Sequence, residues 1–88
     1  MVEREKKVVN ALGIHARPAS KIVQTATSFT SKITLIKDTT IADAKSILHV
    51  MMLGANFGST VRIKASGDDE KQAVEAIALL FDRKFDED

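Results

Sequence analysis

Residues 60–66 read Thr-Val-Arg-Ile-Lys-Ala-Ser, and this stretch has the most regular pattern in the chain. Three apolar side chains alternate with Arg62 and Lys64, so apolar groups point to one face and charged groups to the other. Such alternation predicts a strand that is buried on one face and near water on the other, which is typical of an antiparallel sheet. The other elements must therefore cover one face of a sheet.

Three further segments carry strand signals. Residues 32–37 are β-branched and alternating, and Asp38-Thr39 predicts a turn into a short return strand at residues 40–43, which completes a hairpin. Residues 2–9 are the first strand, although Lys6 interrupts its apolar face. Together with residues 60–66 these segments give four strands.

Three segments have the period of a helix. One runs from about Ala16 to Ser28, and a two-turn helix starts after Ser46, its expected N-cap, and stops at Gly54. Acidic residues 68–70 open a last helix, and the charged tail at residues 82–88 is expected to fray. The two longer helices have the apolar faces Ala19, Ile22, Val23, Ala26 and Phe29, and Ala73, Val74, Ile77, Leu80 and Phe81.

The predicted element order is β-α-β-β-α-β-α. We expect an α+β fold, an open-faced β-sandwich in which three helices cover one face of a four-stranded antiparallel sheet. The 88 residues predict a single domain, 1–88, which is large enough for a two-layer core but not for a deep, enclosed active site as well.

Composition narrows the class of protein. The chain is 44% hydrophobic and 28% charged, without cysteine, so it has neither a disulfide framework nor a thiolate metal site. No apolar run approaches the roughly 20 residues of a membrane span, and no signal-peptide pattern is present. We therefore expect a cytoplasmic protein without membrane insertion.

Charge is unevenly distributed along the chain. Residues 1–67 carry ten basic and four acidic side chains, whereas residues 68–88 carry three basic and eight acidic ones. The basic part could meet nucleic acid or an acidic protein surface. Because the chain lacks Trp and Tyr and has only four Phe, it has few stacking platforms for bases. A small basic nucleic-acid-binding domain is therefore the more distant alternative.

Gly13-Ile14-His15-Ala16-Arg17-Pro18-Ala19 is the segment with the clearest chemistry. A histidine side chain is substantially neutral at pH 7, so one ring nitrogen can attack phosphorus without a separate base. The free N–H groups of Ala16 and Arg17 and the Arg17 guanidinium could meet the charge of the phosphate. The structural alternative is a polar loop in which a histidine happens to precede a helix.

This segment closely resembles the active site of the HPr family, the histidine-containing phosphocarrier proteins of the bacterial phosphoenolpyruvate:sugar phosphotransferase system. Ala44-Lys45-Ser46-Ile47-Leu48 resembles the regulatory-serine segment of that family, and Leu53-Gly54 and residues 65–70 fit as well. Element order and spacing match over essentially the whole chain.

The resemblance implies a phosphoryl carrier rather than an enzyme with turnover of its own. His15 would accept a phosphoryl group from enzyme I through Nδ1, beside Arg17, and pass it to the enzyme IIA domains of sugar permeases. No metal and no cofactor are expected, and a monomer suits a carrier that visits several partners. A regulatory relative, or one that serves a nitrogen-related pathway and acts mainly through protein binding, is the nearer alternative.

Ser46 has two compatible roles. Serine is a favoured N-cap, and the resemblance adds phosphorylation by an HPr kinase/phosphorylase. The segment here reads Ser-Ile-Leu-His-Val-Met-Met-Leu, whereas the commonest Gram-positive form reads Ser-Ile-Met-Gly-Val-Met-Ser-Leu, so His49 and Met52 depart from it.

A docking surface is expected beside His15. Leu48 and Met52 would form an exposed apolar patch with Lys45 and Lys21 as its basic rim, while the core takes Ile47, Val50 and Met51. The full predicted partner surface, which also counts Ile47 and Met51, is Ser20, Lys21, Gln24, Lys45, Ile47, Leu48, His49, Met51 and Met52. Two histidines without cysteine do not complete a zinc site, so His49 is expected on a solvated helix surface.

Overall fold

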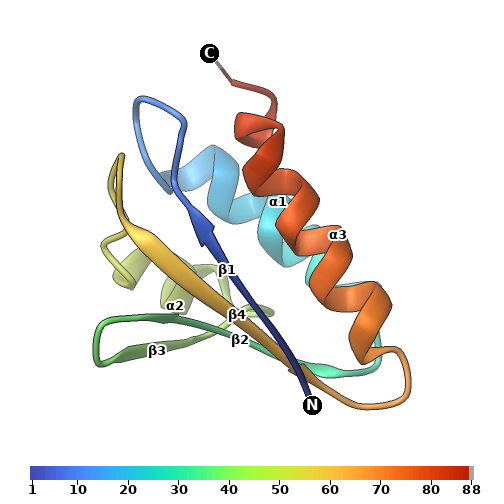
Figure 1. Cartoon of the computed structure of the whole chain (residues 1–88). Coiled ribbons are helices and arrows are strands. Elements are labelled where there is room, and N and C mark those ends of the chain that lie inside the picture. The colour runs from blue at the N-terminus through green and yellow to red at the C-terminus, as the bar shows by residue number, and fades with distance from the viewer. Residues whose placement is uncertain (88) are drawn as a thin grey trace.

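The computed structural model describes residues 1–87 and consists of one sheet and one helical layer (Figure 1). Its four strands are antiparallel in the order β1-β4-β2-β3. The elements are β1 (Val2–Lys7), α1 (Ala16–Thr27), β2 (Lys32–Lys37), β3 (Thr40–Asp43), α2 (Ile47–Met52), β4 (Thr60–Ser66) and α3 (Glu70–Asp82), followed by a one-turn 3-10 helix, η1 (Lys84–Asp86). Asp88, the end of the predicted domain and tail, lies outside the described residues.

The alternation in β4 is confirmed. Val61, Ile63 and Ala65 are buried, whereas Arg62 is exposed. Leu35 of β2 lies opposite Ile63, so the two central strands present their apolar side chains to the same core. Burial of these side chains is the main favourable term that pairs the strands in this register rather than one residue out of register.

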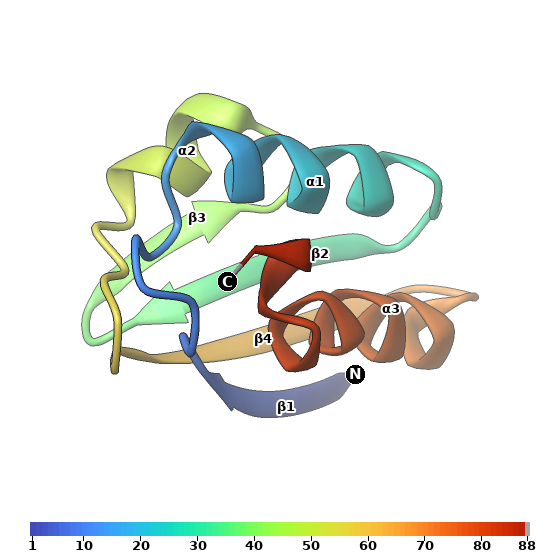
Figure 2. The ribbon, with the colours of Figure 1, turned by 90° about the horizontal axis from the view of Figure 1, so that it is seen from above.

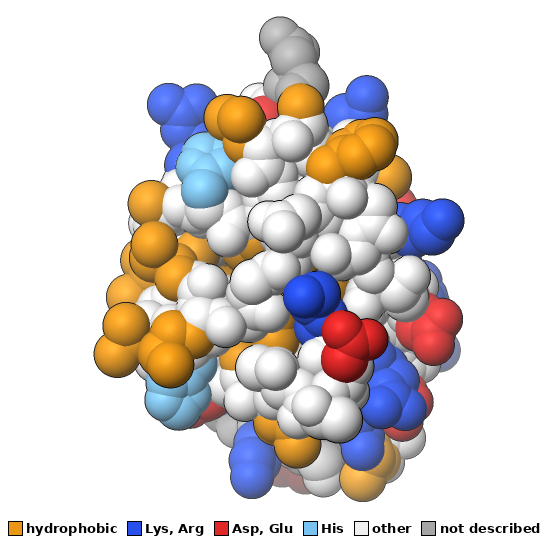
Figure 3. Space-filling view, turned by 90° about the vertical axis from the view of Figure 1, so that its left-hand side faces the viewer, with side chains coloured by type: hydrophobic (Ala, Val, Ile, Leu, Met, Phe, Trp, Pro, Cys, Tyr) orange, Lys and Arg blue, Asp and Glu red, His pale blue; other side chains and the backbone are white. Residues whose placement is uncertain are grey.

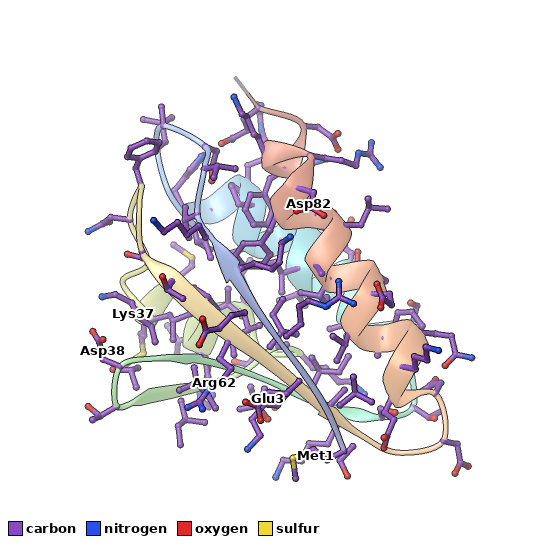
Figure 4. All side chains as sticks on the ribbon, in the orientation of Figure 1. Met1, Glu3, Lys37, Asp38, Arg62 and Asp82 are labelled. Carbon is purple, nitrogen blue, oxygen red and sulfur yellow. The ribbon has the colours of Figure 1, made fainter. Side chains whose placement is uncertain are left out.

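The helices cover one face of the sheet and leave the other open, as predicted (Figure 2). α3 packs on β1 and β4, α2 packs on β3, and α1 contacts both other helices. On the open face Glu3 and Arg62 form an ion pair at 3.5 Å between neighbouring strands (Figure 4). None of the helices formed by residues 1–87 has the length and apolar character to span a bilayer.

β1 ends two residues earlier than predicted. It stops at Lys7, which pairs with Thr60 at the start of β4, so no strand continues beside Val8. Val8 instead forms two backbone hydrogen bonds of 2.8 Å with the loop before β4, as donor to Ser59 and as acceptor from Gly58. Val8 is fully buried all the same, and this contact fixes the start of the loop that leads to His15.

The prediction of a fraying tail is wrong for its described part. Phe85 is fully buried and packs edge-on against Phe81, with 4.9 Å between the ring centroids. Phe85 follows Phe81 by four residues and so continues the apolar stripe of α3 beyond the end of the helix. The last turn of the chain is therefore anchored in the core, and it reaches back to the loop before α1.

Candidate functional site

The loop before α1 is fixed by a close backbone contact. Gly13 has a φ of +71°, and a Cβ placed on it would lie 2.8 Å from the carbonyl oxygen of Ala55 and 2.9 Å from Cα of Asn56. The N–H of Ile14 donates to the same Ala55 carbonyl at 2.9 Å. Because only glycine tolerates both the φ and the contact, the sequence Gly13-Ile14 sets the direction in which the chain enters α1.

His15 is the N-cap residue of α1, with an extended backbone (φ −92°, ψ −165°). Its side chain makes no capping hydrogen bond to the first turn of the helix. The N–H groups of Ala16 and Arg17 belong to that first turn and have no acceptor within the helix, and Pro18 has no N–H. The positive end of the helix dipole and two free donors therefore adjoin the imidazole.

A carboxylate from the other end of the chain contacts the ring. Nε2 of His15 lies 2.9 Å from Oε2 and 3.1 Å from Oε1 of Glu87. The fully buried Asn10 donates from Nδ2 to Oε1 of Glu87 at 3.0 Å and to the carbonyl oxygen of Gly13 at 2.7 Å. Neither Asn10 nor Glu87 was predicted from the sequence, although the spacing of Phe85 from Phe81 was a signal that the tail returns to the core.

Several groups set the pKa of Glu87. Desolvation is the largest single influence and raises the pKa. The hydrogen bonds from His15 and Asn10 and the electrostatic interactions with the His15 ring and the Arg17 guanidinium together outweigh desolvation, so the pKa of Glu87 is below its ordinary value. Glu87 is therefore ionised at neutral pH and can only accept hydrogen bonds.

The Arg17 side chain is exposed, and within residues 1–87 its guanidinium forms no hydrogen bond or ion pair. It influences Glu87 through its charge. A guanidinium with free donors next to the helix entrance could form paired hydrogen bonds to a phosphate. Within the same residues no group of three His, Cys, Asp or Glu side chains is arranged to bind a metal ion.

Ser46 is the N-cap of α2, as predicted, and its hydroxyl oxygen accepts a hydrogen bond of 3.3 Å from the N–H of His49. The predicted core of this helix is wrong in two positions: Val50 is fully buried, but Ile47 and Met51 are each 45% exposed. A helix of six residues can turn only one narrow stripe inward, and Val50 fills it.

The exposed side chains of α2 form a continuous apolar area. Leu48 and Met52 are 64% and 69% exposed, as expected, and Ile47 and Met51 extend the area. Figure 3 views the face on which hydrophobic side chains gather between the two histidines. We call Ile47, Leu48, Met51 and Met52 the α2 patch. His49 is exposed on the same helix.

The predicted basic rim has structural partners of its own. Lys45 donates from Nζ to the carbonyl oxygen of Phe29 at 2.8 Å, and Lys21 is 3.3 Å from Asp86. Lys45 therefore links the start of α2 to the loop after α1, and Lys21 links α1 to η1. Ser20 and Gln24 lie four residues apart on α1, half-buried and exposed respectively.

Known proteins resemble this chain over its full length. The family model described as "PTS HPr component phosphorylation site" matches residues 2–83. Phosphocarrier protein HPr of Treponema pallidum is 47% identical over 88 residues, which cover both chains completely. Phosphocarrier protein NPr of Proteus mirabilis is 43% identical over 86 residues, 97% of this chain and 96% of that protein. The crystal structure of HPr-C-His from Thermoanaerobacter tengcongensis superimposes with a TM-score of 0.96 at 43% identity, covering 100% of this chain and 99% of the other.

Proposed function

The chain belongs to the HPr family of phosphocarrier proteins, and from that premise we propose that it carries a phosphoryl group on His15 between enzyme I and enzyme IIA domains. The observation that carries the proposal is the placement of His15 at the start of α1, where the ring makes no capping bond and two backbone donors adjoin it. These features support an acceptor whose phosphate is bound at the surface and can leave again. The 88 residues act as one carrier unit, a cytoplasmic monomer.

The transfer needs few groups. A lone pair on His15 attacks phosphorus, the bond from phosphorus to the donor breaks, and the donor keeps that electron pair. The amides of Ala16 and Arg17 and the Arg17 guanidinium face the charge on the phosphoryl oxygens. Phosphoryl transfer depends mainly on positioning and charge stabilisation, so no further catalytic group is required in the carrier.

Labelled phosphoenolpyruvate with enzyme I and Mg²⁺ tests this function. One acid-labile, alkali-stable phosphate per chain is expected, His15→Ala should take none, and His49→Ala, the matched histidine control, should still take one. Label that persists on His15→Ala would refute the assignment. Arg17→Ala should slow transfer about 10- to 100-fold without unfolding the domain, because one preorganised charge is lost.

Ser46 is proposed as a regulatory phosphorylation site. Phosphate at this position adds about two negative charges next to the α2 patch, where a partner would dock, and it would repel an acidic partner surface. Its N-cap position favours such an anion. ATP with an HPr kinase/phosphorylase should give an acid-stable phosphate that Ser46→Ala abolishes, and no incorporation would leave Ser46 with its capping role alone.

A second candidate is a carrier in a nitrogen-related phosphotransfer pathway. It is favoured by the NPr of Proteus mirabilis, whose identity of 43% is near the 47% of the HPr of Treponema pallidum. Comparing transfer rates from the sugar-pathway enzyme I and from its nitrogen-related counterpart separates the two functions. Faster transfer from the latter would assign the chain to the nitrogen pathway.

A further inference from the structure

The hydrogen bonds around Glu87 run in a fixed direction. The carboxylate is ionised and only accepts, so Nε2 of His15 must be the donor across the contacts of 2.9 and 3.1 Å. The side chain of Glu87 is only 11% exposed, so water competes little for this contact.

Asn10 fixes the same direction from the other side. Its Nδ2 donates to Glu87 and to the carbonyl of Gly13, while its buried Oδ1 has no hydrogen-bond partner within residues 1–87. Turning the amide over would place Oδ1 against these two acceptors and lose both bonds. The amide orientation is therefore determined, and the Glu87 oxygens lie between two donors.

From this arrangement we infer that Glu87 is a positioning residue that keeps the ring proton of His15 on Nε2 and so leaves the lone pair on Nδ1 for phosphorus. The inference rests on the proposed function, and it adds a carboxylate, held by the buried Asn10, to the group that the sequence motif contains. Nδ1 is the nitrogen without a hydrogen bond within residues 1–87.

The proton does not move during the transfer. The Nδ1 lone pair forms the new bond to phosphorus while the donor keeps the electrons of the bond that breaks, and the ring becomes a phosphoimidazolium that still carries its proton on Nε2. The Glu87 carboxylate stabilises this positive ring, as a carboxylate stabilises the imidazolium of a catalytic triad. When phosphorus leaves for the next acceptor, Nδ1 regains its lone pair and the ring is neutral again.

The backbone before Glu87 is strained in a way that serves this contact. Lys84, Phe85 and Asp86 have φ values of 55°, 54° and 60°, the left-handed region that costs roughly 1–2 kcal/mol per residue with a side chain. The burial of Phe85 and the contacts of Asp86 with Lys21 and Arg83 hold the turn. This left-handed turn directs Glu87 back to the loop before α1.

Two substitutions at Glu87 separate a positioning role from a structural one. In Glu87→Gln, Asn10 keeps the oxygen at the Oε1 position, so the new NH₂ group takes the Oε2 position, which is the nearer one to Nε2 at 2.9 Å. A donor there favours a neutral ring that accepts at Nε2 and carries its proton on Nδ1, over one that donates from Nε2 to the oxygen 3.1 Å away, and transfer from phospho-enzyme I should fall roughly 100-fold. Glu87→Ala only releases the ring, so a mixture of tautomers and a loss of about tenfold are expected.

The ring tautomer is read from the ¹⁵N chemical shifts of His15 in labelled protein, and transfer is measured in single-turnover experiments. Asp82→Asn is the matched control, because it removes a carboxylate at the end of α3 that pairs with Lys6 instead (Figure 4). It should keep the Nε2–H tautomer and transfer within twofold of the original chain.

The relative transfer rates of the two Glu87 variants distinguish a positioning role from a structural one. A glutamine variant that transfers more slowly than the alanine variant, with the proton on Nδ1, supports the inference, since loss of packing alone would make alanine the worse substitution. Unchanged ¹⁵N shifts, or transfer at the original rate in Glu87→Gln, would overturn it. If the unsubstituted chain takes no phosphate from phospho-enzyme I, the proposed function itself fails, and the tautomer of the free ring still tests the role of Glu87.

Discussion

His15 and Ser46 occupy equivalent positions in their helices, the N-caps of α1 and α2, but their side chains have different partners. The Ser46 hydroxyl accepts a hydrogen bond from its own helix, at the N–H of His49. The His15 ring makes no bond to its own helix and contacts Glu87, which is 72 residues away in the chain. One N-cap stabilises its helix, whereas the other leaves its helix amides free.

The difference shows that an N-cap side chain can either bind its own helix or leave the first-turn amides free for another acceptor. A side chain that caps its helix already uses the first-turn amides that would otherwise face an anion. At His15 these amides stay available because support for the ring comes from the C-terminal turn. The free amides of α1 therefore depend on the contact between His15 and Glu87. The effect of a substitution on either feature can be compared with its effect on the Ser46 cap.

Among the substitutions considered, Phe85→Ala should lower the free energy of unfolding most. Emptying a buried aromatic position costs roughly 3–5 kcal/mol, a large part of the stability of a small domain. It should release Glu87 from His15 and leave the Ser46 cap intact. Urea unfolding measures the loss of stability. The chemical shifts of the His15 ring report whether Glu87 is released, and hydrogen exchange of the His49 amide reports whether the Ser46 cap persists. Phe85→Leu, a milder variant that keeps the fold, should move the His15 shifts in the same direction; loss of the Ser46 cap alone would contradict this.

Gly13→Ala tests whether the close backbone contact positions His15. The positive φ and the clash with Ala55 should together cost roughly 1–3 kcal/mol. Gly58→Ala is the matched control, because Gly58 has a φ of +88° but no atom within 4 Å of the place that a Cβ would take, so only the strain of the backbone remains. Thermal unfolding of both variants compares them, and equal losses would mean that the contact with Ala55 contributes nothing.

Ser46→Ala should cost about 1 kcal/mol, since one orphan amide in the first turn of α2 loses its acceptor. Ser46→Asp keeps an acceptor at the same place and should recover most of the loss. Urea unfolding measures both variants, and the His15 ring shifts should not change in either. An alanine variant as stable as the original chain would show that the hydrogen bond of 3.3 Å between the His49 amide and the Ser46 hydroxyl does not contribute to stability.

Acid should break the support of His15 but not the cap of Ser46, and we expect the loss of stability to be the smallest because one partner of the contact, the His15 side chain, is 37% exposed. In the folded protein the pKa of Glu87 is lowered from its ordinary value of 4.5. The ionised carboxylate therefore contributes its full stabilisation of the fold above pH 4.5, and this contribution is lost as the pH falls through the lowered pKa. The hydroxyl of Ser46 does not titrate in this range. A pH titration followed by NMR should therefore move the Glu87 signals and leave the amide of His49 unchanged.

Asp69 provides an internal reference in the same titration. The hydroxyl of Ser31, then the amide of Thr30, lower the pKa of Asp69 to about 2, so the bonds between the loop before β2 and the start of α3 should persist until the pH approaches that value. Loss of the Asp69 bonds already near the ordinary pKa of an aspartate, about 4, would contradict this expectation.

The sheet could be predicted because each strand signal is local. Val61, Ile63 and Ala65 alternate within one segment, and burial of one face follows from that pattern alone. The role of Glu87 could not be predicted in this way, because a charged tail residue carries no periodic signal. Its position depends on a turn with three left-handed residues, which no local propensity favours, and on the burial of Phe85.

Part of the candidate site could be predicted for the same reason. His15 and Arg17 stand in one motif, so their neighbourhood is a property of a short stretch of chain. Ile47 and Met51 were assigned to the core because a helical pattern does not state how many of its apolar residues a short helix can bury. Which side chains of α2 stay exposed was decided by packing against the neighbouring elements.

Mirror-image amino acids would fit the turn at Lys84–Asp86 better than natural ones. For a D-residue the left-handed region is what the right-handed helix is for an L-residue, so the steric cost there disappears. An 88-residue chain is short enough to be assembled by chemical ligation, and the exposed Lys84 is the simplest place for a D-alanine. The chirality of one peripheral residue would then adjust how firmly the last turn is closed over His15, without any change in the residues that touch the ring.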